Sequence, residues 1–393
     1  MKKILLAVNN MNVNGVKTSL LNMMRALDLN KYEVTVLLLE KRGVLLDSIP
    51  KGINVIAFNE FQEIKEMAYL TFRDAVSALF NFHRYWQLIL YIFFYFLSYM
   101  FRDPGILYSY LIKRMPELSD NYDYAVSYFG PLDILSYYIL YKTCARKKVQ
   151  WIHFDVRMIN FDIKFARKYY HKFDKIYTVS NRAKDVLEEI LRDLSIESFI
   201  LPIPKEDIIN LSKENTIHYQ HNKFQIVTIG RLVPQKGPDI ALTIAKYLKK
   251  RGVNFEWHFI GGGEMYDSLR KDIISNGLKG YFYLEGEQIN PFRYLPEADL
   301  YVQPSRHEGY GLTLQEAKVV GVPIVCTNFT GANEQIENGV NGIIVNNDTE
   351  SLLQAILNIL PNKQLRENFR QVLRDDQSLD NGCSRFEKIY MEE

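Results

Sequence analysis

Short apolar runs alternate with amphipathic segments over most of this chain. Ile4 to Val8 is a continuous apolar run, Val16 to Leu27 carries apolar residues at helical spacing, and Val34 to Leu39 is a second apolar run. Continuous runs of this length are typical of strands buried on both faces of a parallel sheet, whereas the 3.6-residue spacing predicts a helix. The start of the chain therefore predicts a βαβ unit.

The same alternation predicts two further groups of strands. In the first half we expect strands at residues 124–128, 149–154 and 176–179, the last of these ending the N-terminal set, and then a helix over 181–191 with Ser180 as its N-cap. In the second half the apolar runs predict strands at residues 224–229, 257–260, 281–284, 300–302 and 324–326. With 393 residues, 47% of them hydrophobic, the chain exceeds the usual size of a single core. We therefore expect two α/β domains.

The boundary between these domains is predicted by Pro202 and Pro204, which precede a polar stretch running from Lys205 to Asn222. We interpret this stretch as a linker. The expected N-terminal domain covers residues 1–204 and the expected C-terminal domain covers residues 205–375. Amphipathic spacing from Ser351 onward predicts further helices near the end of the chain.

Residues 58–120 interrupt the βαβ pattern and predict an aromatic-rich helical insertion. Within them, Tyr85 to Phe101 is a run without charge, flanked by Arg84 and Arg102. A membrane-spanning helix needs about 20 apolar residues, so a span is the least favoured interpretation. A buried or groove-lining helix is favoured first. An interfacial membrane contact is the close alternative, because aromatic residues prefer the membrane interface, and it would let this surface meet a lipid-linked acceptor.

Basic residues outnumber acidic ones between Lys142 and Lys175. The basic residues are Lys142, Arg146, Lys147, Lys148, Arg157, Lys164, Arg167, Lys168, Lys172 and Lys175, against Asp155, Asp162 and Asp174. A solvated helix face explains such a stretch, and so does attraction to an anionic membrane surface or to an acceptor's phosphates. The sequence leaves both explanations open.

Overall charge and cysteine content narrow the class of protein. The formal net charge is +2, and no partner of the nucleic-acid class is expected. Cys144, Cys326 and Cys383 share no close spacing, so we expect neither a disulfide framework nor a zinc site, and a reducing cytoplasm is the simplest location. The basic tip of the chain precedes an apolar run too short for a signal peptide, which we interpret as a first buried strand.

The segment Ser305 to Ala317 carries the strongest functional signal. It follows the predicted strand 300–302 and Pro304, contains Gly309 and Gly311, and leads into a predicted helix from Thr313 to Val320. Glu308 is thus expected at the carboxyl end of a strand, and Glu316 in the first turn of the helix. In an open α/β sheet this edge binds ligands, and the helix N-terminus attracts phosphate.

Two carboxylates eight positions apart suit a sugar nucleotide, because each can accept hydrogen bonds from hydroxyl groups. In this interpretation Glu308 holds the sugar and Glu316 the ribose. An equally weighted alternative is a capping box, Thr313-x-x-Glu316, in which Glu316 only bonds the N-cap amide. Spacing alone does not separate the two.

The run Glu308-Gly309-Tyr310-Gly311, with Glu316-Ala317 and then Gly321-x-Pro323-Ile324-Val325, resembles the signature of retaining nucleotide-sugar glycosyltransferases of family four. The resemblance covers most of the C-terminal half, and the N-terminal half only in patches. It implies the GT-B architecture, in which two Rossmann-like domains face each other across a cleft. The second domain would bind the donor and the first the acceptor. A C-terminal helix, here residues 376–393, would return to the first domain.

The resemblance also implies roles for individual residues. Gly230-Arg231-Leu232 with Lys236-Gly237 matches the family's G-R-L-x-x-x-K-G, so the two cations are expected to stabilise a diphosphate leaving group. His153 is the candidate for the family's cleft-edge histidine. The expected donor-binding residues are Gly15, Arg231, Lys236, Gln288, Glu308, Gly309, Tyr310, Gly311, Leu312, Thr313 and Glu316, and the expected catalytic residues are Glu308, Arg231, Lys236 and His153. One departure weakens the case for Gly15, because Asn14 replaces a glycine that the family usually has there.

The expected activity is transfer of a hexosyl unit from a nucleotide diphosphate sugar, UDP-linked in the first instance, to a hydroxyl with retained anomeric configuration. We expect a lipid-linked saccharide acceptor in cell-surface polysaccharide synthesis, in the cytoplasm or on the inner face of the cell membrane. No Asp-x-Asp follows a predicted strand, and Glu285-Gly286-Glu287 only superficially resembles a metal motif, so no metal and no cofactor are expected. The alternatives are a non-catalytic acceptor- or membrane-binding subunit, a sugar-nucleotide epimerase, and a phosphorylase, for which no cofactor lysine is found.

Overall fold

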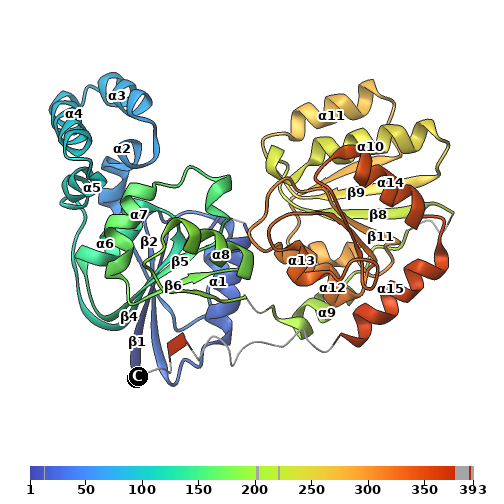
Figure 1. Cartoon of the computed structure of the whole chain (residues 1–393), viewed down its shortest axis with the longest axis horizontal. Coiled ribbons are helices and arrows are strands. Elements are labelled where there is room, and N and C mark those ends of the chain that lie inside the picture. The colour runs from blue at the N-terminus through green and yellow to red at the C-terminus, as the bar shows by residue number, and fades with distance from the viewer. Residues whose placement is uncertain (13, 201–202, 220–221, 377–388, 391–393) are drawn as a thin grey trace. The chain divides into compact units, whose positions relative to one another are not determined.

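The computed structural model describes residues 1–376 except 13, 201–202 and 220–221, together with Ile389 and Tyr390. The described chain divides into two compact units (Figure 1). Unit 1 holds the residues up to Ile200 together with Ile389 and Tyr390, and unit 2 holds residues 203–376. Each unit is one parallel sheet with helices packed on it. This arrangement confirms the predicted fold class, two Rossmann-like α/β domains.

Unit 1 contains a seven-stranded sheet in the order β3-β2-β1-β4-β5-β6-β7. The strands are β1 (Lys2–Val8), β2 (Tyr32–Leu38), β3 (Asn54–Ala57), β4 (Leu118–Gly130), β5 (Thr143–Ile152), β6 (Lys175–Thr178) and β7 (Ile196–Ser198). The helices on and around the sheet are α1 (Gly15–Ala26), α6 (Asp133–Lys142), α7 (Ile163–Tyr169) and α8 (Asn181–Ile190), with short 3-10 turns η1 (Val44–Ser48), η2 (Asn59–Glu63), η3 (Val156–Met158) and η4 (Tyr170–Lys172).

Hydrophobic burial explains why the central strands of unit 1 could be predicted. Ile4 to Val8 of β1 are fully buried, because β2 and β4 pair with this strand on its two sides and helices cover its faces. Two predictions about this sheet need correction. The strand predicted to be the last, β6, is followed by the edge strand β7, whose three residues are too few to show a pattern. Strand β4 begins well before the predicted 124–128, and the sequence did not indicate this because its first residues are polar.

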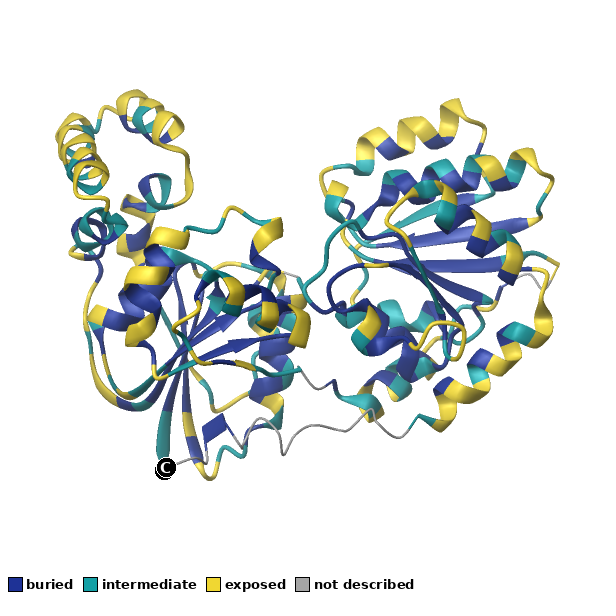
Figure 2. Ribbon diagram, viewed as in Figure 1, coloured by how far each residue is buried: buried dark blue, intermediate teal, exposed yellow. Residues whose placement is uncertain are grey.

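Between β3 and β4 the chain forms the helical insertion that the sequence predicts for residues 58–120. Its helices are α2 (Lys65–Tyr69), α3 (Phe72–Asn81), α4 (Tyr85–Met100) and α5 (Pro104–Ile112). α5 packs against α6, α4 against α5, and α3 against α4, so α3 and α4 lie farthest from the sheet (Figure 1). Only Tyr91 of α4 is buried. Of the favoured prediction, a buried or groove-lining helix over 85–101, the buried form is therefore wrong, because none of the described residues of unit 1 covers its outer face (Figure 2).

Unit 2 contains a six-stranded sheet in the order β10-β9-β8-β11-β12-β13. The strands are β8 (Phe224–Ile229), β9 (Phe255–Ile260), β10 (Phe282–Gly286), β11 (Leu300–Gln303), β12 (Ile324–Thr327) and β13 (Ile343–Val345). The helices are α9 (Lys205–Lys213), α10 (Pro238–Lys250), α11 (Tyr266–Ser275), α12 (Leu312–Val320), α13 (Ala332–Gln335), α14 (Thr349–Ile359) and α15 (Lys363–Asp375), with 3-10 turns η5 (Pro234–Lys236) and η6 (Pro291–Tyr294).

The segment predicted as a linker, Lys205 to Asn222, contains helix α9. Ile208 of α9 is buried against Val319 of α12, so this segment belongs to the core of unit 2. The prediction of a linker is wrong over residues 205–213. The helix was not recognised in the sequence because it has only a few apolar residues among many polar and charged ones. At the other end of the chain, Tyr390 is fully buried in unit 1, where its hydroxyl contacts the sulfur of Met23 at 3.3 Å. The rest of the predicted returning helix lies outside the described residues, apart from Asp376 and Ile389.

Candidate functional site

The predicted donor-site residues of unit 2 gather where the strand order reverses. β8 lies between β9 and β11, with Val227 beside both His258 and Tyr301. The loops that follow β8 and β11 therefore leave the same edge of the sheet next to each other, the position where open α/β sheets bind ligands. The two loops touch at Gly237, where a Cβ would lie only 2.1 Å from the carbonyl oxygen of Pro304. Glycine is required there for that contact and for its φ of 67°.

Lys236 and Glu308 form an ion pair between these loops. The same carboxylate oxygen, Glu308 Oε1, also accepts hydrogen bonds from Gln303 Nε2 at 3.0 Å and from Ser305 Oγ at 2.9 Å. The other oxygen, Oε2, receives no hydrogen bond from any residue that the structure describes. One oxygen of Glu308 is thus fixed by three donors, while the second is left to accept hydroxyl groups of a ligand.

The N-terminus of α12 begins directly after this loop, at Gly311. Gly311 adopts the left-handed conformation with φ 91°, and no side chain caps the helix. The capping-box alternative is therefore excluded, because Thr313 lies inside the first turn and its hydroxyl donates to Gln303 Oε1 at 3.3 Å. An uncapped helix N-terminus presents free N–H groups and a partial positive charge, which favour a phosphate.

Glu316 is the fifth residue of α12 and begins its second turn, one residue later than the sequence predicts, because the helix already begins at Leu312. Its side chain is buried. Desolvation raises the pKa of this carboxyl to about 7, and the nearby Lys236 charge opposes the shift only in part. Glu316 therefore keeps its proton to a higher pH than an exposed glutamate does.

Arg231 lies at the end of β8 and is exposed. It makes no ion pair with any of the residues that the structure describes. The glycine turn that follows β9 packs on the backbone of this loop: a Cβ on Gly261 would lie 2.0 Å from the Gly230 oxygen, and one on Gly263 would lie 2.4 Å from the Leu232 oxygen. The predicted tight turn at residues 261–263 thus supports the Arg231 loop through close backbone contacts.

Three residues that the sequence analysis missed hold this site in place. Gln303 and Ser305 fix Glu308, and Gln335 of α13 donates to the carbonyl oxygen of Tyr310 at 2.5 Å. Gln303 and Ser305 are both buried. The sequence indicated them only as two polar residues that directly follow the apolar run 300–302. Gln335 had no such signal, because it reaches Tyr310 only through tertiary packing.

Gln288, the predicted base contact, folds back onto its own loop and donates to the Glu285 carbonyl oxygen at 2.7 Å. The Glu285 carboxylate bonds His258 Nδ1 at 2.6 Å, and this pairing lowers the pKa of Glu285. Within the Glu285-Gly286-Glu287 segment, the Glu285 carboxylate is therefore already bound by a histidine of the neighbouring strand β9. Among the described residues no group of three or more His, Cys, Asp or Glu side chains is arranged to hold a metal ion.

The two predicted site residues of unit 1 lie at the corresponding edge of its sheet. Gly15 opens α1 in the loop after β1, and Asn14 caps this helix by accepting from the Lys17 amide at 3.1 Å. Capping gives a physical reason for asparagine where the family usually has glycine. Helix α1 also carries the buried Lys17, whose ammonium lies 3.1 Å from the centre of the Phe129 ring.

His153 directly follows β5, and its ring is buried between Tyr128 and Trp151. Desolvation lowers the pKa of this imidazole to about 3, so the ring is neutral at physiological pH. Its Nε2 atom has no hydrogen-bond partner among the described residues. The role of His153 near the donor sugar stays a prediction of the family resemblance.

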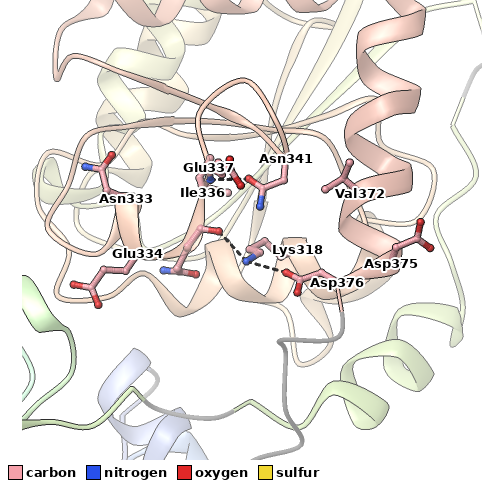
Figure 3. Close-up of a pocket in the computed structure, with 10 residues that line it drawn as sticks. Lys318, Asn333, Glu334, Ile336, Glu337, Asn341, Val372, Asp375 and Asp376 are labelled. Atoms are coloured by element: carbon pink, nitrogen blue, oxygen red, sulfur yellow. Dashed lines mark hydrogen bonds and ion pairs between the residues drawn. The ribbon is translucent and has the colours of Figure 1, made fainter.

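A groove of about 710 Å³ lies elsewhere in unit 2, beside the end of α15 (Figure 3). Lys318 is at its base and bonds the Gln335 carbonyl oxygen at 2.8 Å and the Asp376 carboxylate at 3.4 Å. Four carboxylates also line it, those of Glu334, Glu337, Asp375 and Asp376. None of the predicted donor-binding residues lines this groove, and its acidic lining disfavours an anionic diphosphate.

Comparison with known proteins finds similarity to glycosyltransferases. Residues 212–375 match the model of the family described as glycosyl transferases group 1. The chain is 33% identical to the amylovoran biosynthesis glycosyltransferase AmsK of Erwinia amylovora, over 35% of this chain and 36% of that protein. It is 29% identical to the UDP-Gal:alpha-D-GlcNAc-diphosphoundecaprenol alpha-1,3-galactosyltransferase of Escherichia coli, over 44% of each chain. The chain thus spans about half or less of the length of these curated relatives.

Solved structures show the same fold. Anabaena HepE in complex with UDP and glucose superimposes with a TM-score of 0.69 at 14% identity, covering 99% of this chain and 98% of that one. A TarM variant from Staphylococcus aureus, also solved with UDP, superimposes with a TM-score of 0.71 at 16% identity, covering 100% of this chain and 99% of that one. These likenesses show that the chain has the GT-B fold.

Proposed function

We propose that this GT-B protein is a retaining glycosyltransferase that moves a hexosyl unit from a UDP-linked sugar to a hydroxyl group of a saccharide. The observation that carries the proposal is the pairing of Lys236 with one oxygen of Glu308, next to the uncapped N-terminus of α12. A cation, a hydroxyl-binding carboxylate and a phosphate-binding helix end converge there. These are the groups that a sugar diphosphate requires.

Each part has a distinct task in the proposed reaction. Glu308 Oε2 accepts hydroxyl groups of the donor sugar, while Gln303 and Ser305 hold the opposite oxygen still. Lys236, Arg231 and the N–H groups at the start of α12 stabilise the negative charge that grows on the diphosphate as it leaves. Glu316 accepts the ribose hydroxyls. A hydrogen bond from His153 to the sugar stays a prediction of the family resemblance.

The proposed step is a same-face substitution. The bond between the anomeric carbon and the diphosphate oxygen breaks, and its electron pair goes to that oxygen. The acceptor hydroxyl oxygen forms the new bond on the same face of the sugar, and its proton passes to the departing diphosphate. Glu308 is already used to hold hydroxyls, so no carboxylate is assigned as a nucleophile. The step needs no metal ion in this proposal, because the cationic side chains and the helix end neutralise the diphosphate.

The relatives support a donor and an acceptor class. The Escherichia coli relative is named for a UDP-linked donor and a diphosphoundecaprenol-linked acceptor, and the Staphylococcus aureus relative is named as a poly(ribitol-phosphate) alpha-N-acetylglucosaminyltransferase. We propose by analogy a UDP sugar and a lipid-linked saccharide of cell-surface polysaccharide synthesis. The reaction would take place in the cytoplasm.

The test measures release of UDP and transfer of label from a panel of labelled UDP sugars to lipid-linked saccharides, with the product's anomeric configuration read by NMR. Arg231→Ala and Lys236→Ala should each reduce turnover by about a hundredfold or more, because each removes one preorganised charge from the leaving group. Lys250→Ala, which removes an exposed lysine at the end of α10, is the matched control. Excess chelator should leave the rate unchanged.

Full turnover in both folded cation variants would reject the roles of Arg231 and Lys236. An inverted product would reject the same-face step, and a rate that returned only with added manganese or magnesium would reject metal independence. Binding of UDP without any transfer, across the whole panel of donors and acceptors, would favour the non-catalytic subunit instead.

A further inference from the structure

The insertion in unit 1 presents a continuous apolar surface to solvent. We define the aromatic face as Phe80 and Phe82 at the end of α3, together with Trp86, Ile89, Phe93, Phe96 and Met100 of α4. Every one of these side chains is at least half exposed. Figure 2 shows both helices as mostly exposed along their length. Single exposed apolar residues are ordinary on soluble proteins, whereas a contiguous set of this kind marks an interaction surface.

The composition of α4 shows that the exposure is not incidental. From Tyr85 to Phe101 there is no charged residue, although a helix that faces water normally carries charges along that face. The exposed positions 86, 89, 93, 96 and 100 follow helical spacing and form one stripe. The opposite side of α4 packs on α5, where Tyr110 stacks on Phe94 at 4.6 Å. On the side toward α3, Phe72 stacks on Tyr95 at 4.1 Å, so α4 is held by α3 and α5 while the stripe stays exposed.

The length of α4 decides how such a helix meets a membrane. Its 16 residues make it about 24 Å long, shorter than the roughly 30 Å hydrocarbon core of a bilayer. None of the described helices is long and apolar enough to span a bilayer. A short helix with an apolar face and aromatic residues instead suits the plane of the membrane interface.

Basic residues flank the aromatic face locally. Over the whole insertion, residues 58–120, six Lys or Arg residues stand against seven Asp or Glu residues, so the positive charge is confined to the ends of α4 and to α3. Arg102 is exposed at the end of α4 and Arg73 on α3, whereas Arg84 at the start of α4 is partly buried and paired with Glu66 at 3.5 Å. The basic helix α7 is fastened to the same region, because Lys168 bonds the Asp103 carboxylate at 2.7 Å just beyond Arg102. Such a rim attracts anionic lipid headgroups.

We propose that the aromatic face docks on the surface of an anionic lipid bilayer, with α4 lying in the plane of the interface. Tyr85, Trp86 and Tyr99 near the ends of α4 would sit at headgroup level, and the middle of the stripe would enter the acyl boundary. A second copy of the chain fits less well, because pairing the face with itself would bring two arginine rims together. The proposal rests on side chains of unit 1 and is independent of the transferase reaction.

Trp86 supplies a site-specific probe in the unmodified protein. The sequence has three tryptophans, of which Trp151 and Trp257 are fully buried and Trp86 is 81% exposed. Vesicles of phosphatidylcholine with phosphatidylglycerol should shift the tryptophan emission to shorter wavelength and protect it from acrylamide. Lipids brominated in the acyl chain should quench it. In Trp86→Phe the vesicles should still bind, but these spectral changes should disappear.

Two paired substitutions test the two parts of the surface by vesicle co-sedimentation. Phe93→Ser with Phe96→Ser should weaken binding about tenfold or more, because two apolar side chains no longer leave water. The matched control is Tyr247→Ser with Ile274→Ser, an equally exposed apolar pair on α10 and α11. Arg73→Ser with Arg102→Asn should lower the affinity for vesicles that contain phosphatidylglycerol about tenfold and leave the affinity for pure phosphatidylcholine vesicles unchanged. Asparagine tolerates the positive φ of 52° at position 102.

The proposal is overturned if vesicles bind without changing Trp86 emission, or if the control pair weakens binding as much as the Phe93 and Phe96 pair. It is also overturned if the protein is dimeric without lipid, with Trp86 emission already at short wavelength, and becomes monomeric in the Phe93 and Phe96 variant. That outcome would assign the face to a second copy of the chain. Light scattering after gel filtration gives the mass.

Discussion

At the scale of single residues, the site depends on how each carboxylate is surrounded. Glu308 is held by a lysine, an amide and a hydroxyl on one oxygen, which orients the carboxylate and leaves its other oxygen open. Glu316 has only a nearby positive charge to offset the loss of water. Two glutamates eight positions apart are thus placed in opposite environments, which suits them to different hydroxyl-binding tasks.

Glu308→Gln tests the first of these environments. The substitution removes the ion pair with Lys236 and the hydroxyl-binding oxygen, so turnover should fall by about a hundredfold while affinity for bare UDP changes little. Steady-state kinetics and calorimetric titration measure the two effects. Glu350→Gln, an exposed glutamate of α14, is the control. A loss of UDP affinity equal to the loss of turnover would contradict a role at the sugar.

Glu316 predicts a pH dependence of stability. Because the folded pKa is raised to about 7, above the ordinary value of 4.5, the folded state retains a proton that the unfolded chain has lost between these pH values. The stabilisation is fully present below about pH 4.5 and disappears as pH rises through about 7. Glu316→Gln cannot ionise, so it should become more stable than wild type across this window, by up to about 3 kcal/mol.

Unfolding of both proteins in urea at pH 5 and pH 8 measures this difference. The two stability curves should diverge as the pH rises. A constant difference at both pH values would show that Glu316 is not desolvated in the folded protein. In the same samples, loss of UDP affinity in Glu316→Gln would support the ribose contact, and unchanged affinity would leave Glu316 with a structural role.

At the scale of elements, α12 is positioned by packing from several directions. α9 packs on α12 through Ile208 and Val319, and Phe329 closes against Gly311 at its start. The carbonyl oxygen of Tyr310, just before the helix, is held by Gln335. The helix N-terminus is thereby fixed without a side-chain cap, so its N–H groups remain available to a phosphate.

Gly311→Ala tests the start of this helix. Its φ of 91° disfavours any side chain, and a Cβ would lie 2.8 Å from the Phe329 ring. The variant should lose about 2 kcal/mol or more of stability and bind UDP more weakly. Gly252→Ala is the matched control, because its φ is 74° but its Cβ would meet no atom within 4 Å. Equal losses in both variants, with UDP binding intact, would contradict a steric role for Gly311.

At the scale of the whole molecule, the two units have separate cores. The main core of unit 1 gathers around the sheet that contains β1 and β4, and two apolar clusters cover the faces of the unit 2 sheet. Each unit therefore has enough buried apolar surface to fold as a cooperative body. The donor-site cluster around Glu308 lies entirely within unit 2.

Calorimetric unfolding should therefore show two transitions. UDP should raise the temperature of one transition, because a ligand that binds only one native unit stabilises that unit first. Lys236→Ala should lower the size of this shift. A single transition that moves as a whole with UDP would contradict independent cores.

The sequence by itself determined the class of fold and the position of the main motif. Apolar runs such as Ile4 to Val8 and 300–302 are local, and a strand buried on both faces needs no more than such a run. Glu308 at the carboxyl end of β11 followed from the same local pattern. The helical insertion at 58–120 was also predictable, because its residues break the alternation of strands and helices.

Only the tertiary structure decided which groups surround these residues. The ion pair of Lys236 with Glu308, the burial that raises the pKa of Glu316, and the packing of α9 on α12 all depend on residues distant in sequence. The exposure of α4 is the clearest case, because an apolar run of this length fits a protein core and a membrane interface equally well. Burial is a property of what packs against a segment, and that is decided by the whole fold.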